Sequence, residues 1–301
     1  MKIAIVGASG FLASNLAFFL GEKSGMQVVG VSRTKSQIFT DWIPYLGPHN
    51  LATDLHDNGV SYIINCAAIT SHEKAAADPD AAYKVNALLA EDIATVASDL
   101  NIGLCHISTD AVYNGNSITP HTEESPKDPR TAYGASKLLG EQLVLNTYPQ
   151  ALVARTNFFG WSPQGSTGIL DFFHYRLKNN QKTVGFTDYR VSSIYVGHLA
   201  RVLTDLFYSS KSGVFNIGAS EPMSKYEFGV QVADTFGFDS RLIESGSIHD
   251  DVALSTRGLF LGLETTKVAI ALGQAMPSTL EGIEEAKEDQ EKIFRWFGRQ
   301  G

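Results

Sequence analysis

Short runs of consecutive apolar, often β-branched residues alternate with longer amphipathic stretches in the first half of the chain. The apolar runs lie at residues 2–6, 27–31, 62–65 and 103–107. Runs that are apolar at successive positions are typical of strands covered on both faces, as in parallel sheets. Between them, residues 13–20 and 81–100 repeat apolar positions at helical spacing. The alternation predicts an α/β fold with a doubly wound parallel sheet.

The pattern changes after about residue 160. A loop rich in Gly, Ser, Pro and Gln covers residues 160–168, and mixed helices and short strands follow, including a strand-like run at 213–218 and a helix near 279–296. This shift predicts a first domain at residues 1–160 and a smaller α+β lobe at residues 161–301. We expect some segments of the lobe to return to the first domain.

Composition narrows the class of protein. The 301 residues are 44% hydrophobic and 19% charged, which argues against disorder, and the net charge of −8 argues against nucleic acid as a partner. No uninterrupted apolar run reaches the roughly 18 residues needed to cross a membrane. The first residues lack an apolar signal segment, and both cysteines lie in apolar runs. We therefore expect a cytoplasmic protein with reduced thiols.

The first apolar run ends in a glycine-rich turn that leads directly into a helical pattern. Residues 7–13 read Gly-Ala-Ser-Gly-Phe-Leu-Ala. Gly7 and Gly10 permit a tight turn and a close approach of backbone N–H groups to a pyrophosphate, and the following helix N-terminus favours the anion. Between a strand and a helix, this motif predicts a dinucleotide site, with a purely structural turn as the alternative.

The residues after the second apolar run bear on which dinucleotide binds. An acidic residue there would accept the ribose 2′-hydroxyl of NAD, but the sequence provides Ser32, Arg33 and Lys35. A hydroxyl and two cations suit a 2′-phosphate, so NADP(H) is favoured over NAD(H). The alternative is that both cations are merely solvated. Asp54 is expected to meet the adenine, unless it only forms a turn.

Tyr133 and Lys137 are four residues apart at the start of a predicted helix, so they share one face. A nearby ammonium stabilises a phenolate and lowers the pKa of the phenol, which makes Tyr133 a candidate acid. The spacing alone is weak evidence, because a chain with 11 tyrosines often contains such a pair by chance. The order of motifs strengthens it: Thr109 stands between the glycine turn and this pair, at a strand end where α/β sheets bind ligands.

With these motifs the chain resembles the extended short-chain dehydrogenases/reductases, and within them the dTDP-4-dehydrorhamnose reductase family, from residue 1 to about residue 270. The resemblance is carried by Ile64-Asn65-Cys66-Ala67-Ala68, Glu73-Lys74-Ala75, Ser108-Thr109-Asp110, His121-Thr122-Glu123, Tyr133-Gly-x-Ser-Lys137, Ala154-Arg155-Thr156, Arg257 and Leu263-x-Thr-x-Lys267. It implies a Rossmann domain with a smaller lobe for a nucleotide sugar. It also implies NADPH-dependent reduction of the C4 ketone of a nucleotide-linked 4-keto-6-deoxy sugar.

The resemblance implies roles for individual residues. Thr109 would bind the substrate oxygen, and Tyr133 would supply the proton. Lys137 would hold the nicotinamide ribose and lower the pKa of Tyr133, and Asn86 would complete a proton relay. Cofactor contacts are expected at Gly7, Ser9, Gly10, Phe11, Leu12, Ser32, Arg33, Lys35, Asp54, Leu55, Cys66, Ala67, Ala68, Tyr133 and Lys137. Substrate contacts are expected at Asp110, Tyr113, Asn157, Phe158 and Arg257.

The chain departs from the family pattern at several positions, so the resemblance does not identify the substrate sugar. Residues 157–159 read Asn-Phe-Phe where the family usually has a Trp, and Gly258 stands where a Pro usually follows the arginine. Ala111 leaves Asp110 as one acid where a 4,6-dehydratase needs two. The rival interpretations are an epimerase of nucleotide sugars at C4 with tightly bound NAD, and a non-catalytic reductase-like regulatory subunit. No histidine or cysteine spacing indicates a metal site, and a homodimer is the default expectation.

Overall fold

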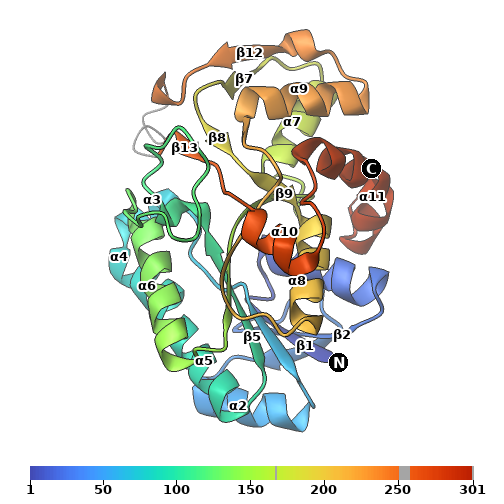
Figure 1. Cartoon of the computed structure of the whole chain (residues 1–301). Coiled ribbons are helices and arrows are strands. Elements are labelled where there is room, and N and C mark those ends of the chain that lie inside the picture. The colour runs from blue at the N-terminus through green and yellow to red at the C-terminus, as the bar shows by residue number, and fades with distance from the viewer. Residues whose placement is uncertain (167, 251–257, 300–301) are drawn as a thin grey trace. The chain divides into compact units, whose positions relative to one another are not determined.

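The computed structural model describes residues 1–166, 168–250 and 258–299 (Figure 1). It divides the chain into two compact units. Unit 1 comprises Met1–Val112, Thr131–Arg155 and Thr204–Phe215, and unit 2 comprises Tyr113–Arg130, Thr156–Leu203 and Asn216–Gly301. The predicted boundary at residue 160 lies near the change of unit after Arg155. Residues 204–215 return to unit 1, whereas residues 113–130 leave it early, which the sequence pattern did not indicate.

The sheet of unit 1 has the doubly wound arrangement. Its strands are β1 (Lys2–Val6), β2 (Gln27–Ser32), β3 (Asp41–Pro44), β4 (Tyr62–Asn65), β5 (Gly103–Thr109), β6 (Leu152–Phe159) and β10 (Gly213–Ile217), of which β6 and β10 continue into unit 2. The strand order is β10-β6-β5-β4-β1-β2-β3, so the order reverses beside β1. This confirms the predicted α/β fold class.

The parallel register brings several strand ends to one edge of the sheet. Val6 at the end of β1 is aligned with Val31 in β2 and with Asn65 in β4. Asn65 is in turn aligned with His106 in β5. Ligands of open α/β sheets bind at this carboxyl edge, where the order of the strands reverses.

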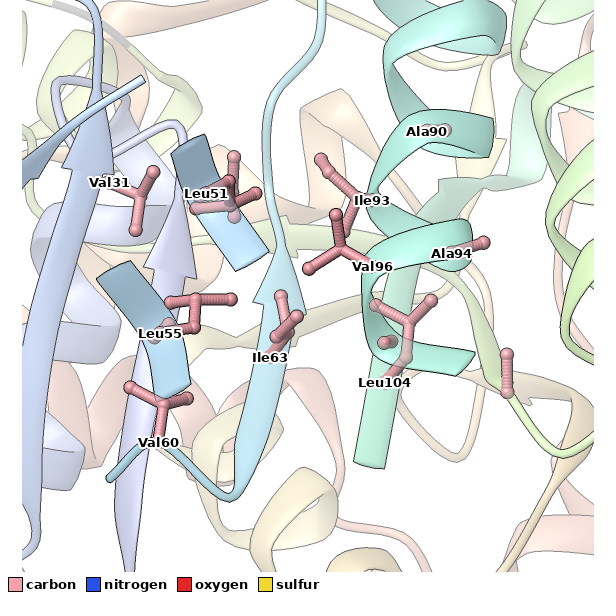
Figure 2. Close-up of a cluster of buried hydrophobic side chains, with 14 of the residues drawn as sticks. Val31, Leu51, Leu55, Val60, Ile63, Ala90, Ile93, Ala94, Val96 and Leu104 are labelled. Atoms are coloured by element: carbon pink, nitrogen blue, oxygen red, sulfur yellow. The ribbon is translucent and has the colours of Figure 1, made fainter. Parts of the chain in front are cut away.

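The helices of unit 1 connect these strands. They are α1 (Phe11–Leu16) with the π-helical continuation η1 (Ala17–Lys23), α2 (Pro48–Asp57), α3 (His72–Ala77), α4 (Pro79–Tyr83), the π-helical η2 (Lys84–Leu88), α5 (Leu89–Asp99), the short 3-10 helix η3 (Asp110–Val112) and α6 (Ala132–Thr147). Helices α5 and α6 pack side by side (Figure 1). Between α2, α5 and the sheet lies a dry apolar cluster that includes Val31, Leu51, Leu55 and Ile93 (Figure 2).

Unit 2 contains smaller sheets and the remaining helices. Its elements are α7 (Ile169–Lys178), β7 (Thr183–Phe186), β8 (Arg190–Val191), β9 (Ser193–Tyr195), α8 (Val196–Tyr208, which ends in unit 1), β11 (Met223–Ser224), α9 (Lys225–Phe236), the short 3-10 helix η4 (Ser240–Leu242), β12 (Ile243–Gly246), the short 3-10 helix η5 (Ile248–Asp250), β13 (Phe260–Leu261), α10 (Thr266–Leu272) and α11 (Thr279–Trp296). Capping boxes start α9 at Ser224 and α11 at Ser278. Trp161 donates a 2.8 Å hydrogen bond to the carbonyl of Ala286 in α11. Among the described residues, no helix has both the length and the apolar character of a membrane span.

Candidate active site

The glycine turn lies between β1 and α1 and leaves no space for a side chain. Gly7 has φ +86°, and a Cβ atom there would lie 2.8 Å from the backbone nitrogen of Ala67. The N–H groups of Gly7 and Ala8 both donate to the carbonyl of Val31, which anchors the turn to β2. Ser9 and Gly10 are exposed just before α1 begins at Phe11. At Gly7 the turn therefore presents backbone, and not a side chain, at the carboxyl edge of the sheet.

The residues after β4 complete this edge. Cys66, Ala67 and Ala68 are partly buried, and the N–H of Cys66 donates to the carbonyl of Val6. Burial raises the pKa of the Cys66 thiol to about 12, so this side chain is neutral and not a nucleophile at neutral pH. The structure thus brings together two segments that lie more than fifty residues apart in the sequence. Both segments were predicted to contact the cofactor. Of the remaining residues in the first segment, Leu12 is buried and Phe11 is half-buried.

The side chains predicted to bind the 2′-phosphate differ in their solvent exposure. Arg33 and Lys35 are exposed after β2, as a phosphate site requires. Ser32 is buried, and its hydroxyl donates to the Thr34 carbonyl at 2.7 Å and accepts from Trp42 Nε1 at 3.1 Å. The Ser32 hydroxyl could donate a hydrogen bond to a phosphate only if its present bond to the Thr34 carbonyl were broken.

The structure corrects the expected positions of Asp54 and Leu55. The third strand is β3, which ends at Pro44, and both residues lie well beyond it, within α2. Leu55 is fully buried in the apolar cluster (Figure 2), so it contributes packing and makes no cofactor contact. The error arose because β3 is short and carries Asp41 and Trp42, which obscured the apolar run.

Thr109 and Tyr133 meet as the motif order predicted. Thr109 ends β5, and Tyr133 lies in the first turn of α6, which Thr131 caps by accepting from the Gly134 N–H at 3.2 Å. The Thr109 side chain interacts with the Tyr133 phenol and offsets part of the rise in its pKa. The Thr109 hydroxyl also donates to Asp110 Oδ1 at 3.0 Å.

The pKa of Tyr133 moves in the direction opposite to the prediction. Burial raises it to about 12, the hydrogen bond with Thr109 lowers it in part, and the negative charge of Asp110 raises it further. The expectation that Lys137 brings this phenol toward neutral pH is wrong for this structure, because desolvation is the largest effect on its pKa. Tyr133 is consequently a protonated phenol throughout the neutral range, which is the form of a proton donor.

Lys137 points into the sheet from one turn further along α6. Its Nζ lies 3.1 Å from Nε2 of His106 and 2.6 Å from the carbonyl of Ile107. Burial lowers the pKa of Lys137 to about 8, against smaller raising effects of Glu141 and Cys66. The sequence analysis did not identify His106 as part of the site, and the only available signal was a polar residue within a buried strand.

Asn86 is buried in η2 and fastens the loop after β4 to α6. Its Oδ1 accepts from the Ile69 N–H at 2.7 Å, and its Nδ2 donates to the Ile69 carbonyl and to Ser136 Oγ. A Cβ atom at Gly140 would lie 2.2 Å from the Asn86 carbonyl, so this glycine lets α6 approach η2. The geometry shows a positioning role for Asn86, and π-helical turns often occur at functional sites.

A further aromatic contact at Tyr133 was not expected from the sequence. The ring of His72, at the start of α3, meets the Tyr133 ring edge-on with 4.9 Å between centroids. The sequence analysis included Glu73 and Lys74 in a motif but did not identify the histidine before them as part of the site.

Unit 2 contains a cavity of about 250 Å³ that two of the predicted substrate residues line. Asn157 and Phe158 belong to its wall, and Asn157 Oδ1 accepts from Ser193 Oγ at 2.6 Å. The full lining is Asn157, Phe158, Ile169, Tyr189, Val191, Ser193, Met223, Ser224, Lys225, Phe228 and Thr279. Aromatic rings, hydroxyls and one ammonium group thus surround the space.

The remaining predicted substrate residues are placed differently. Tyr113 is fully buried, and its hydroxyl lies within hydrogen-bond distance of two acceptors, 2.9 Å from the Thr122 carbonyl and 3.0 Å from Asn216 Oδ1. Its substrate role is corrected to a packing role, since neither ring nor hydroxyl is accessible. Asp110 is also buried and lies beside Thr109. Arg257 lies outside the described residues.

The described part of the chain holds no group of three His, Cys, Asp or Glu side chains that could bind a metal ion.

The fold and the Thr109, Tyr133 and Lys137 arrangement define the class: this is an NAD(P)-dependent oxidoreductase of the extended short-chain dehydrogenase/reductase type. The model of the RmlD substrate binding domain family matches residues 1–291, and the chain belongs to that family.

Individual relatives are similar along most or part of the chain. The probable low-salt glycan biosynthesis reductase Agl14 of Haloferax volcanii is 28% identical over 93% of this chain and 95% of its own length. The dTDP-4-dehydrorhamnose reductase of Mycolicibacterium smegmatis is 34% identical over 56% of this chain and 47% of its own length. The crystal structure of dTDP-4-dehydrorhamnose reductase from Bacillus anthracis in complex with NADP shares the fold, with TM-score 0.85, 22% identity and coverage of 96% and 99% of the two chains.

Proposed function

We propose that the protein reduces the C4 ketone of a nucleotide-linked 4-keto-6-deoxy sugar with NADPH. The observation that carries the proposal is the interaction of the Thr109 side chain with the Tyr133 phenol, with Lys137 one helical turn from the tyrosine, in a member of the RmlD family. Relatives of this chain include dTDP-4-dehydrorhamnose reductases, which supports the nucleotide-sugar class. The substrate assay identifies the nucleotide base of the substrate and the stereochemistry of the product alcohol.

The residues at the carboxyl edge of the sheet fit a dinucleotide. The close approach of Gly7 to Ala67 forms a cradle that any side chain at residue 7 would fill. In the proposed complex, the turn at residues 7–12 holds the pyrophosphate, and Arg33 and Lys35 bind the 2′-phosphate. Bound NADPH supplies the hydride that reduces the ketone.

The chain's own groups supply the proton and the orientation. Tyr133 carries its proton at neutral pH because burial raises its pKa to about 12, so it can protonate the alkoxide that forms at C4. Thr109, whose side chain interacts with the Tyr133 phenol, orients the carbonyl oxygen. Asn86 keeps the segment after β4 in place against α6 through its bonds to Ile69 and Ser136.

The cavity of unit 2 suits the nucleotide part of such a substrate. Phe158, Tyr189 and Phe228 offer aromatic surfaces for a base or sugar ring, and Lys225 offers positive charge for a phosphate. We infer that this cavity binds a nucleotide.

The test is NADPH oxidation with a panel of dTDP-, UDP- and GDP-linked 4-keto-6-deoxy sugars, followed by product identification. We expect turnover with at least one member, loss of turnover in Tyr133→Phe, and full activity in Tyr208→Phe, which changes an exposed tyrosine. Absence of NADPH oxidation with every sugar would refute the proposal. NAD released from denatured protein, together with NADPH-independent epimerisation, would instead identify an epimerase.

A further inference from the structure

The segment between β2 and β3, which carries the two exposed cations, is anchored at the residue that precedes it. Ser32 ends β2 and is buried, and its carbonyl accepts from the Tyr45 N–H at 3.0 Å. Its hydroxyl lies 2.7 Å from the Thr34 carbonyl and 3.1 Å from Nε1 of Trp42 in β3. The segment therefore starts from a side chain that is bonded on two sides.

The chemistry of these groups fixes the direction of both hydrogen bonds. An indole N–H can only donate and a carbonyl can only accept, so neither assignment depends on a tautomer or on the orientation of an amide. Trp42 donates to the Ser32 oxygen, and the single hydroxyl hydrogen of Ser32 is donated to the Thr34 carbonyl. This hydrogen is not available to a ligand as long as the turn at residues 32–34 is closed.

The register of β2 and β3 explains how the indole reaches Ser32. Trp42 is aligned with Gly30, which lies two residues before Ser32 and therefore on the same face of the sheet. Gly30 leaves space on this face, because a Cβ atom there would lie 2.6 Å from the Phe39 ring and 2.9 Å from the Ala8 Cβ. Phe39 is buried, so the end of the segment is anchored to β2 as well.

The closed turn lies beside the glycine turn. The first two N–H groups of the glycine turn donate to the carbonyl of Val31, the residue directly before Ser32. Arg33 and Lys35 follow, and both are exposed. Both cations have long side chains, and binding one phosphate with two such groups costs less when their backbone is already fixed. Closure of the turn at residues 32–34 provides this fixed backbone.

We propose that Trp42 and Ser32 are positioning residues of the 2′-phosphate site and do not touch the ligand themselves. The indole N–H directs the Ser32 hydrogen onto the Thr34 carbonyl. The closed turn then holds Arg33 and Lys35 so that one phosphate group contacts both. Only the choice of NADPH as the natural ligand rests on the proposed function, because a 2′-phosphate site can be measured without any sugar.

Isothermal titration calorimetry with two adenosine phosphates measures this site on the full chain. Adenosine 2′,5′-bisphosphate and adenosine 5′-monophosphate differ only in the 2′-phosphate, so the ratio of their dissociation constants reports its contribution. Both are titrated at the same pH and ionic strength. We expect the wild type to bind the bisphosphate at least about tenfold more tightly. Equal dissociation constants would overturn the inference.

Trp42→Phe keeps an aromatic ring in β3 and removes the N–H. The affinity for the bisphosphate should fall about three- to tenfold, which is the usual effect of one hydrogen bond, while the affinity for the monophosphate stays within about twofold. Trp296→Phe makes the same exchange in α11 and should change neither affinity. An unchanged ratio in Trp42→Phe would overturn the proposal, because the indole would then have no effect on the phosphate site.

A double-mutant cycle shows whether Trp42 acts through Ser32. Ser32→Ala removes both hydrogen bonds, so it should weaken bisphosphate binding at least as much as Trp42→Phe. The double variant should bind no more weakly than Ser32→Ala alone. Additive losses would show that the indole acts on the ligand independently of the hydroxyl, which would overturn the positioning role. Monophosphate binding shows in each variant that the adenosine site is still folded.

The binding experiment and the substrate assay can fail separately. If the bisphosphate results are as expected and NADPH is oxidised with no sugar, the proposed reduction is wrong and the positioning role stands. If the wild type reduces a sugar with NADPH, but Trp42→Phe keeps the wild-type ratio of dissociation constants, the positioning role alone is wrong.

Discussion

The ion pair of Glu141 and Arg155 gives the sharpest stability prediction. Both side chains are buried, Glu141 in α6 and Arg155 in β6. Three nitrogen–oxygen distances of 3.0, 3.2 and 2.7 Å join them, and Ser108 Oγ donates to the same carboxylate at 2.5 Å. Glu141→Leu removes the carboxylate and leaves the guanidinium buried without its counter-charge.

The magnitude follows from which charges remain. Removal of one partner from a buried pair costs about 3–5 kcal/mol, because the other charge stays desolvated. Replacement of both by apolar residues of similar volume is close to neutral, and the Ser108 hydroxyl then loses its acceptor at a cost of about 1–2 kcal/mol. Glu141→Leu loses both the ion pair and the Ser108 acceptor, so we expect it to cost about 4–7 kcal/mol, whereas Glu141→Leu/Arg155→Met should cost only about 1–2 kcal/mol.

Urea unfolding followed by far-UV circular dichroism measures these differences. The wild type, both single variants and the double variant form a double-mutant cycle, and the midpoint of the first transition is compared at constant pH. The wild type should be the most stable, the double variant should follow, and Glu141→Leu should be the least stable. Equal losses in Glu141→Leu and the double variant would refute the reasoning, because the buried guanidinium would then not cause the instability.

Three other predictions concern the cofactor, the acid and pH. Tyr133→Phe should lower kcat at least about a hundredfold while the dissociation constant of NADPH, measured by fluorescence titration, stays within about twofold; normal turnover would exclude Tyr133 as the acid. Arg33→Ser with Lys35→Ser should lower the NADPH over NADH preference in kcat/KM at least about tenfold, and an unchanged ratio would show that both cations are only solvated. Because burial lowers the folded-state pKa of Lys137 to about 8, the unfolded chain binds the extra proton between about pH 8 and 10.5, so stability should rise there by about 3 kcal/mol. Lys137→Met should lose that rise in a pH series of urea midpoints, and a rise equal to the wild type's would contradict it.

The sequence predicted those features that depend on neighbouring residues. Runs that are apolar on successive positions indicated four of the parallel strands, and the Gly7 turn between a strand and a helix indicated the cofactor edge. Tyr133 and Lys137 were identified through their helical spacing, and the structure places both in α6. These signals are local, because backbone periodicity and turn chemistry act within a few residues.

The predictions were wrong where the local sequence pattern was weak or was compatible with more than one arrangement. The short strand Asp41–Pro44 has one buried position, so the sequence pattern missed it. Tyr113 follows the Thr109 motif closely in sequence, but it belongs to unit 2, where its side chain meets Asn216. Neither outcome can be derived from spacing, because each depends on a contact with a distant segment.

By itself, the sequence determined the α/β alternation, the glycine turn and the Tyr133–Lys137 spacing, because propensity and periodicity are carried by adjacent residues. Only the tertiary structure decided the charge environment. Parallel strand register puts Asn65 beside His106, and α6 brings Lys137 onto the same imidazole. Desolvation depends on all the atoms that surround a group, whichever part of the chain they come from, and so the pKa values of Tyr133 and Lys137 were set by folding and not by the motif.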